Sequence, residues 1–159
     1  MFKKLAVWLF VVLFIGCAAL ITRFYTLGLQ SQEMMAIGLV SGTLSPCPEK
    51  PNCINSEFPE DTGHYTEPMS IDGREWAQIQ TLLKTALRKD KGVIKHVSDN
   101  YLAAEYQSQT FGFIDDVEFR FDPVTQLLHV RSASRVGYSD LDANKERVMR
   151  LKQFINDLR

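Results

Sequence analysis

The first part of the chain is continuously apolar, whereas the rest alternates between apolar and polar positions. Residues 5–21 carry no charged side chain; Lys3 and Lys4 precede them, and Arg23 follows. A helix that spans a bilayer needs about 17–25 predominantly apolar residues, whereas the core of a signal peptide usually has about 7–15. The pattern therefore predicts an uncleaved, single-pass membrane anchor over residues 1–24.

The charges beside this run predict its orientation. More positive charge lies before the run than after it, which favours an amino terminus in the cytoplasm and the remainder on the other side of the membrane. An alternative starts from Cys17, because Phe14–Cys17 resembles the lipobox of bacterial lipoproteins, in which the cysteine is lipidated after cleavage. Residues 18–21 continue the apolar run, however, where a lipoprotein usually turns polar. Ordinary secretion is a third alternative, and all three place the following domain on the same side of the membrane.

Two later segments have apolar residues at helical spacing. In the first, Asp72 is a candidate N-cap with Glu75 three positions on, and Gly92 is a helix stop. Its apolar stripe consists of Trp76, Ile79, Leu83 and Leu87. In the second, Ser139 is a candidate cap. The stripe there consists of Leu141, Val148, Leu151, Ile155 and Leu158. Each pattern predicts a helix with one buried face.

The region between these helices has the period-two pattern of strands. Strands are expected over residues 93–97 and 101–108, and alternation of apolar with polar side chains predicts two more over residues 117–121 and 128–131. Such alternation is typical of antiparallel strands with one apolar and one polar face. We therefore predict an α+β fold, a two-layer domain over residues 61–159. Its curved antiparallel sheet has four to five strands, the fifth preceding the first helix, and both helices cover one face.

Residues 25–60 are expected to link the anchor to this domain. They contain Cys47 and Cys53 in a stiff loop with three prolines. Outside the cytoplasm, such a pair most often forms a structural disulfide. A redox-active pair and a metal site remain open alternatives, although no C-x-x-C motif or nearby histidine completes a metal site.

Composition excludes two classes of protein. The chain has 159 residues, of which 45% are hydrophobic and 23% are charged, and its formal net charge is −1. A chain so close to neutral has no bulk electrostatic attraction for nucleic acid, and its apolar content is too high for a disordered protein. The histidines His64, His96 and His129 lack a metal-ligand spacing such as H-E-x-x-H. We therefore expect no nucleic-acid partner, no metal and no cofactor.

The polar face of the predicted sheet carries most of the candidate binding residues. Because alternate residues of a strand share a face, Glu118 and Arg120 lie on one face, and His129 and Arg131 join them from the next strand. Glu105 is expected on the same face. Three interpretations remain open: a solvated face with cross-strand ion pairs worth about 0.2–1 kcal/mol each, a face that binds a ligand or partner, and a catalytic face.

The segment from Arg131 to Arg135 holds two serines. Ser132 and Ser134 point toward the core if the alternation continues, which is unusual, so the strand is expected to end or bulge there. The backbone here, with Arg135, could hold an anion near the start of the last helix. The alternative is local wiring, in which Arg135 or Arg147 pairs with an aspartate at position 115, 116 or 140. The candidate binding residues are Asp116, Glu118, Arg120, His129, Arg131, Ser134 and Arg135. No residue is assigned a catalytic role.

Three groups of residues carry a resemblance to a known family. They are Cys47-Pro48 with Pro51-Asn52-Cys53; Phe111-Gly112-Phe113 with Asp115-Asp116-Val117-Glu118-Phe119; and Arg131-Ser132-Ala133-Ser134-Arg135 with Gly137, Ser139-Asp140, Asn144 and Arg147. From Ile37 to Leu158, the chain resembles the bacterial and plastid family catalogued as domain of unknown function fourteen-ninety-nine. The resemblance implies a membrane-associated or exported domain and brings no agreed activity. For a bacterial protein, the predicted orientation corresponds to the inner membrane, with the C-terminal domain in the periplasm.

Three functions are compatible with these patterns. The first is a non-enzymatic, membrane-anchored module that binds or helps to assemble a protein or an envelope component. The second is a lipid or small-molecule carrier with a cavity between the sheet and its helices. The third is a hydrolase that uses Asp115, Asp116, Glu118 or the two serines, but no strand–serine–helix elbow supports it. We favour the first function, with a protein or lipid as the expected partner.

Overall fold

The computed structural model describes residues 2–71 and 73–158 and shows a long helix that carries a mixed α+β domain. The predicted fold class is confirmed. In chain order the elements are α1 (Phe2–Gln32), β1 (Leu39–Val40), β2 (Thr43–Leu44), β3 (Cys53–Asn55), β4 (Met69–Ser70), α2 (Trp76–Lys89), β5 (Val93–Val97), β6 (Tyr101–Gln107), β7 (Ile114–Asp122), β8 (Leu127–Ser134) and α3 (Ala143–Asp157).

The main sheet is antiparallel and has six strands. Its strand order is β3-β8-β7-β6-β5, and β4 also pairs with β8. The sheet has one strand more than predicted, because β3 lies inside the segment expected to be a linker. Asn55 of β3 pairs with Arg131 of β8, so this part of the segment forms an edge of the main sheet.

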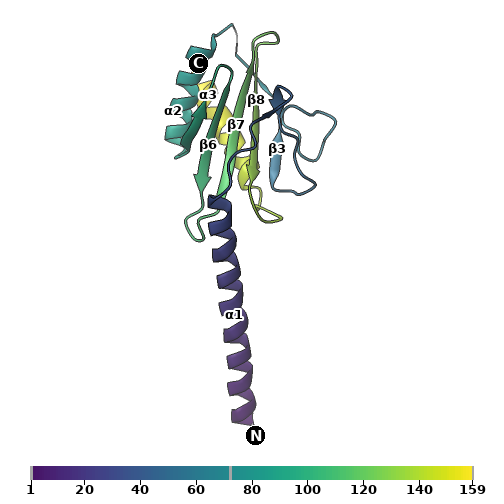
Figure 1. Cartoon of the computed structure of the whole chain (residues 1–159), viewed down its shortest axis with the longest axis vertical. Coiled ribbons are helices and arrows are strands. Elements are labelled where there is room, and N and C mark those ends of the chain that lie inside the picture. The colour runs from purple at the N-terminus through teal and green to yellow at the C-terminus, as the bar shows by residue number, and fades with distance from the viewer. Residues whose placement is uncertain (1, 72, 159) are drawn as a thin grey trace.

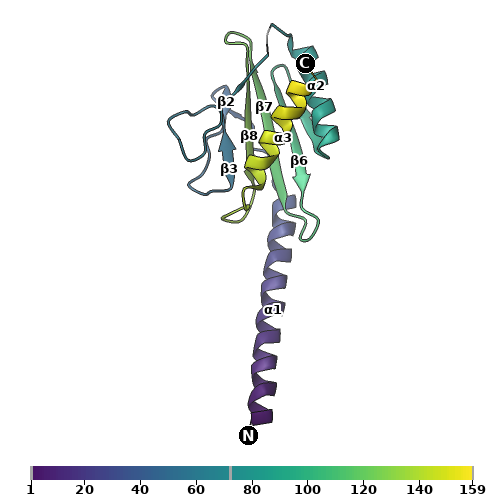
Figure 2. The same cartoon turned by 180° about the vertical axis from the view of Figure 1, so that it is seen from behind.

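Helices α2 and α3 cover one face of this sheet, as predicted (Figure 2). The apolar faces of β6, β7 and β8 point toward them, because the alternating pattern places every second side chain there. The core between the layers is closely filled. Its buried members include Ile79, Leu83, Leu87, Leu102, Val117, Phe119, Leu128, Val130, Val148, Leu151 and Ile155. The cavity that a carrier was expected to have between the sheet and the helices is therefore occupied by side chains.

Both helices of the domain begin later than predicted. The N-cap of α2 is Glu75, whose backbone N–H donates to Gln78 Oε1 at 3.0 Å; the predicted cap, Asp72, lies outside the described residues. Helix α3 begins after Leu141 and Asp142, which both have positive φ and cannot belong to a right-handed helix. Leu141 is consequently 89% exposed, so its assignment to the apolar stripe was wrong.

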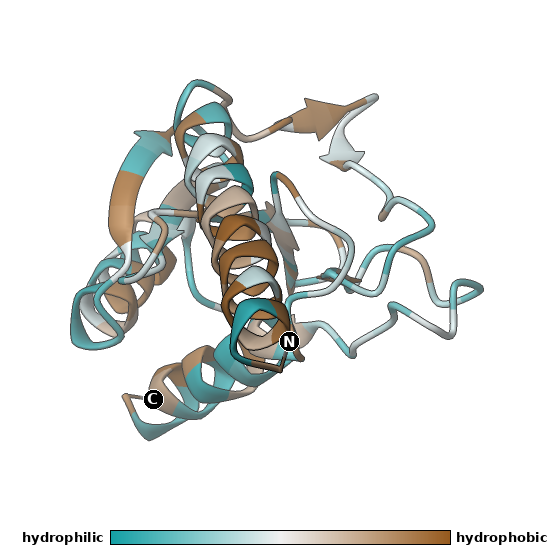
Figure 3. Cartoon of the chain, turned by 90° about the horizontal axis from the view of Figure 1, so that it is seen from below, coloured by the Kyte–Doolittle hydropathy of each residue, from teal (hydrophilic) through white to brown (hydrophobic). Residues whose placement is uncertain are grey.

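Helix α1 extends beyond the predicted anchor. It runs to Gln32 and is long and apolar enough to cross a membrane, with a hydrophobic middle that Figure 3 shows in brown. By length and composition it is compatible with a single-pass anchor or a signal sequence. The helix continues past residue 24 because its last turns pack on the domain, where Gly28 and Ser31 are buried.

The segment after α1 crosses the sheet face opposite α2 and α3 (Figure 1). We call residues 33–44 the strap. The strap contains the two-stranded sheet of β1 and β2, and β2 contacts β7 and β8. Leu44 is fully buried against Tyr101 and Ala103. The strap therefore forms a partial third layer over the polar face of the main sheet.

Candidate functional site

The predicted register of the polar face is found in the structure. Glu118 lies opposite Arg131, and Arg120 lies opposite His129 on the neighbouring strand. The face is nevertheless not solvated, as one interpretation held. Glu118 is 0% exposed and Arg131 is 4% exposed, because the strap and the chain around Glu57 cover them. These charges must therefore be satisfied by protein groups.

Glu118 has hydrogen-bond partners for both carboxylate oxygens. Its Oε2 accepts from Arg131 Nη1 at 2.7 Å, and its Oε1 accepts from the Tyr101 hydroxyl at 2.7 Å. The backbone N–H of Gly38 in the strap donates to the same Oε1 at 2.9 Å. Burial, followed by the nearby Glu118 charge, raises the pKa of Tyr101, so its hydroxyl remains a donor. Glu118 thus fastens the strap to the sheet.

Arg120 forms a second buried ion pair on the same face. Its Nε and Nη2 donate to the two carboxylate oxygens of Glu57 at 2.5 and 3.1 Å. Glu57 Oε2 also lies 3.7 Å from Nδ1 of His129, and this nitrogen lies 3.3 Å from Ser56 Oγ. Burial lowers the pKa of His129, although Glu57 opposes the shift. His129 is therefore a packed neutral imidazole at neutral pH.

Arg135 joins the sheet to α1. Its guanidinium donates to both oxygens of Asp116 at 2.7–2.8 Å, to Glu105 Oε1 at 2.5 Å and to the backbone carbonyl of Ser31 at 3.0 Å. A cation at the last turn of a helix satisfies its free carbonyls and its dipole. Burial acts to raise the pKa of Glu105, but hydrogen bonds from Lys95 and Arg135 outweigh it and lower the value. Burial raises the pKa of Asp116 more than Arg135 lowers it.

The two serines of β8 form hydrogen bonds with α3. Ser132 Oγ donates to Asn144 Oδ1 at 2.5 Å, and Ser134 Oγ accepts from Asn144 Nδ2 at 3.1 Å. Arg147 donates to Asp115 at 2.8 Å, and Arg135 pairs with Asp116, which are two of the arginine–aspartate pairs that the local-wiring alternative predicted. An amide and a guanidinium cannot take a proton from a serine, so neither serine has the partner that a nucleophile needs.

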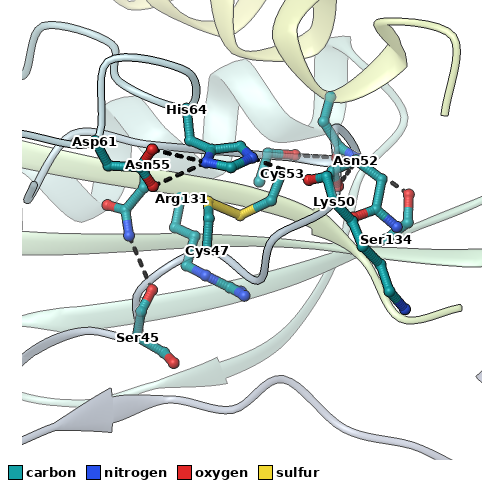
Figure 4. The surroundings of a disulfide bond; sticks show 12 residues. Ser45, Cys47, Lys50, Asn52, Cys53, Asn55, Asp61, His64, Arg131 and Ser134 are labelled. Carbon is teal, nitrogen blue, oxygen red and sulfur yellow. Dashed lines mark hydrogen bonds and ion pairs between the residues drawn. A yellow bond between two sulfur atoms is a disulfide. The ribbon is translucent and has the colours of Figure 1, made fainter. Parts of the chain in front are cut away.

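The predicted disulfide between Cys47 and Cys53 is present, with a Cα–Cα distance of 5.7 Å. Figure 4 shows that polar side chains hold the surrounding loop. His64 bonds to Asp61 through Nδ1 at 2.8 Å and lies 3.0 Å from the Lys50 carbonyl through Nε2. Cys53 is the first residue of β3, so the disulfide restrains the chain that covers the polar face at the start of this strand.

A pocket lies between the strap and the outer face of β5 and β6. Its volume is about 730 Å³, and most of its wall is apolar. We call it the strap pocket. It is lined by Gln32, Glu33, Met34, Met35, Ala36, Gly38, Leu39, Lys95, His96, Ser98, Tyr101, Ala103, Ala104, Glu105, Asp116 and Arg135. The apolar wall comes largely from the strap, and Arg135 with its two carboxylate partners forms one polar end.

The candidate binding residues lie at two pockets and beneath the covering chain. Asp116 and Arg135 line the strap pocket. They also line a second pocket of about 340 Å³ beside the disulfide loop, together with Arg131 and Ser134. Glu118, Arg120 and His129 lie under the covering chain.

Sequence reasoning missed the groups that complete this site. Glu57 and the methionines Met34 and Met35 lie in the predicted linker, for which no contact with the sheet is expected. Ser31 was assigned to the same linker. The available signal was the apolar cluster of residues 34–40 within the predicted linker, which is unusual for a solvated connection.

Within the described residues, no group of three or more histidine, cysteine, aspartate or glutamate side chains is arranged to hold a metal ion.

Comparison with known proteins identifies the family but no activity. No curated protein matches the chain. A family model described as a protein of unknown function, DUF1499, matches residues 43–155, which confirms the resemblance seen in the motifs. The chain therefore belongs to the DUF1499 family.

Proposed function

We propose that this protein is a membrane-anchored, non-enzymatic binding module whose site is the strap pocket. Helix α1 holds the domain at the membrane, with the amino terminus in the cytoplasm and the domain in the bacterial periplasm. The observation that carries the proposal is the position of a largely apolar pocket at the junction between a membrane-type helix and the domain. Apolar pockets with a few converging polar groups are the usual form of ligand sites.

The chemistry of the pocket indicates an amphipathic ligand. Met34, Met35 and Leu39 provide a flexible apolar wall, and methionine adapts to irregular apolar shapes. At the other end, Lys95 bonds to Glu105 at 2.8 Å, beside Arg135. An acyl chain fits the first surface, and a polar head group fits the second. We therefore propose a lipid or lipid-like envelope component as the ligand.

Three alternative functions have less support from the structure: protein capture by the polar face, a carrier with a cavity under the sheet, and a hydrolase. Capture of a protein by Glu118 and Arg131 would require the strap to leave, because both side chains are covered. A carrier cavity between the sheet and the helices would require the core to open. A hydrolase would need a general base beside Ser132 or Ser134, whose hydroxyls instead bond to Asn144.

A probe-binding experiment tests the proposal. The intact protein in mild detergent is titrated with a fatty acid that carries an environment-sensitive fluorophore. His96→Trp adds volume at an exposed position that lines the pocket, and it is expected to weaken binding at least about tenfold, or ~1.4 kcal/mol. The matched control is Lys84→Trp on the exposed face of α2, which should bind as the wild type does. Equal binding by all three proteins would contradict the proposal.

A further inference from the structure

The end of the domain next to α1 carries large apolar side chains that the fold does not use. Tyr138 is 70% exposed and Leu141 is 89% exposed. Both lie in the loop between β8 and α3, and Figures 1 and 2 show this loop at the end of the domain from which α1 leaves. Leu141 also has a φ of 55°, which is unfavourable for leucine. Packing in the domain gives no reason for either residue.

Helix α1 is fixed to this end of the domain rather than loosely tethered to it. Gln32 Nε2 donates to the Gly112 carbonyl at 3.0 Å, and the Ile114 N–H donates to Ser31 Oγ at 3.0 Å. The ring of Phe24 contacts the ring of Phe111 at a centroid distance of 5.4 Å. The loop between β6 and β7 is therefore held against α1, and the whole end of the domain keeps one position relative to the helix.

The distance from the apolar run to this end is short. Arg23 closes the run, and the helix between Arg23 and Ser31 rises by about 12 Å. The polar headgroup zone occupies the outer part of a bilayer that is about 40–45 Å thick around a core of ~30 Å. The loop between β8 and α3, at the same end of the domain as the last turns of α1, is thus within reach of the headgroups. Tyrosine prefers this zone, because its ring is apolar and its hydroxyl is polar.

We propose that the loop of residues 135–142 is a second membrane contact, in which Tyr138 and Leu141 insert into the lipid interface beside the anchor. The partner is the lipid surface itself. This inference rests on the part of the proposed function in which α1 crosses the bilayer. The contact fixes the tilt of the domain, so that the strap pocket stays at a constant height above the lipid.

Spin labels at three positions test the contact in vesicles of phosphatidylcholine and phosphatidylglycerol. Labels are attached to Leu141→Cys, Val124→Cys and Ile15→Cys in a Cys17→Ala chain, with the Cys47–Cys53 disulfide intact. Val124 is the matched control, since it is also 89% exposed and precedes β8 at the opposite end of that strand. Accessibility to oxygen reports lipid, and accessibility to a nickel chelate reports water.

We expect the label at position 141 to gain oxygen accessibility and lose nickel accessibility on reconstitution, while the label at 124 stays accessible to nickel. The label at position 15 reports the anchor separately. Suppose that the label at 15 is exposed to lipid, but the label at 141 is as exposed to water as the label at 124. This result would overturn the loop contact and leave the membrane anchor supported. A water-exposed label at 15 would overturn both.

Discussion

Arg135 donates a hydrogen bond to the backbone carbonyl of Ser31 at 3.0 Å, which joins the end of β8 to the last turn of the apolar helix. The same guanidinium holds Asp116 and Glu105, so one side chain connects α1, β6, β7 and the strap pocket. A movement of the helix relative to the domain would break a buried charge cluster. We infer that helix α1 and the domain move as one body.

Close packing at Gly28 should be necessary for this docking. A Cβ added at Gly28 would lie 1.8 Å from the Phe111 carbonyl oxygen, so Gly28→Ala forces α1 away from the loop between β6 and β7. The Ile114 N–H then loses its bond to Ser31 Oγ, which is worth about 1 kcal/mol. We expect hydrogen exchange at the Ile114 amide to become several-fold faster.

Gly16→Ala is the matched control, because a Cβ at Gly16 meets nothing within 4 Å. Its exchange rate at Ile114 should equal that of the wild type. An unchanged rate in Gly28→Ala would show that docking does not depend on this contact.

Removal of one partner from the buried Glu118–Arg131 pair should be strongly destabilising. Arg131→Met leaves a carboxylate that is 0% exposed without its cation, at a typical cost of about 3–5 kcal/mol. Urea unfolding of the full chain in mild detergent measures the change. Arg150→Met, which removes an ion pair to Asp90 from a side chain that is 49% exposed, should cost less than about 1 kcal/mol. Similar losses in both variants would refute the structural role of the buried pair.

The stability of the domain should fall as the pH drops below about 6.5, in part through His129. Burial lowers the pKa of His129 below its ordinary value of 6.5, so the unfolded chain binds this proton more readily than the folded chain. Stability is therefore lost from pH 6.5 downward, until the folded imidazole also protonates. Unfolding free energies at pH 8 and pH 6 should differ less for His129→Gln than for the wild type. Identical differences would mean that His129 does not contribute.

Loss of the disulfide should weaken the cover over the polar face. Replacing both Cys47 and Cys53 by serine removes the cross-link that closes the loop before β3. The expected loss is about 2–3 kcal/mol in unfolding free energy. Cys17→Ser is the control, since Cys17 is a free, exposed cysteine on α1. If the double variant unfolds with the same midpoint as this control, the disulfide is not a stabilising element.

Local patterns were sufficient to predict the apolar helix, the helices of the domain and the four long strands. The period of two also placed Glu118, Arg120, His129 and Arg131 on one face, because neighbouring antiparallel strands share their alternation. The covering of that face could not be predicted. Strands β1, β2 and β3 have only two or three residues each, too few to show a period. Strand β3 forms through pairing with the distant β8, and the hairpin of β1 and β2 covers the face through contacts with β7 and β8.

The candidate site was only partly predictable for the same reason. The charges of Asp116 and Arg135 were sufficient to predict that they could pair. Their neighbour Ser31, however, lies far away in sequence, on a helix for which the apolar run predicted membrane anchoring and no contact with the domain. The Leu141 assignment failed because helical spacing cannot reveal that positive φ at Leu141 and Asp142 ends the helix before them.

Native mass spectrometry of the intact protein, released gently from its own membranes, shows whether the strap pocket holds a ligand. We expect a bound molecule with the mass of a lipid on the wild-type chain, retained under mild activation, and its loss from His96→Trp but not from Lys84→Trp. A bare wild-type monomer, or an equal amount of bound lipid on all three proteins, would contradict the claim that the strap pocket is a binding site.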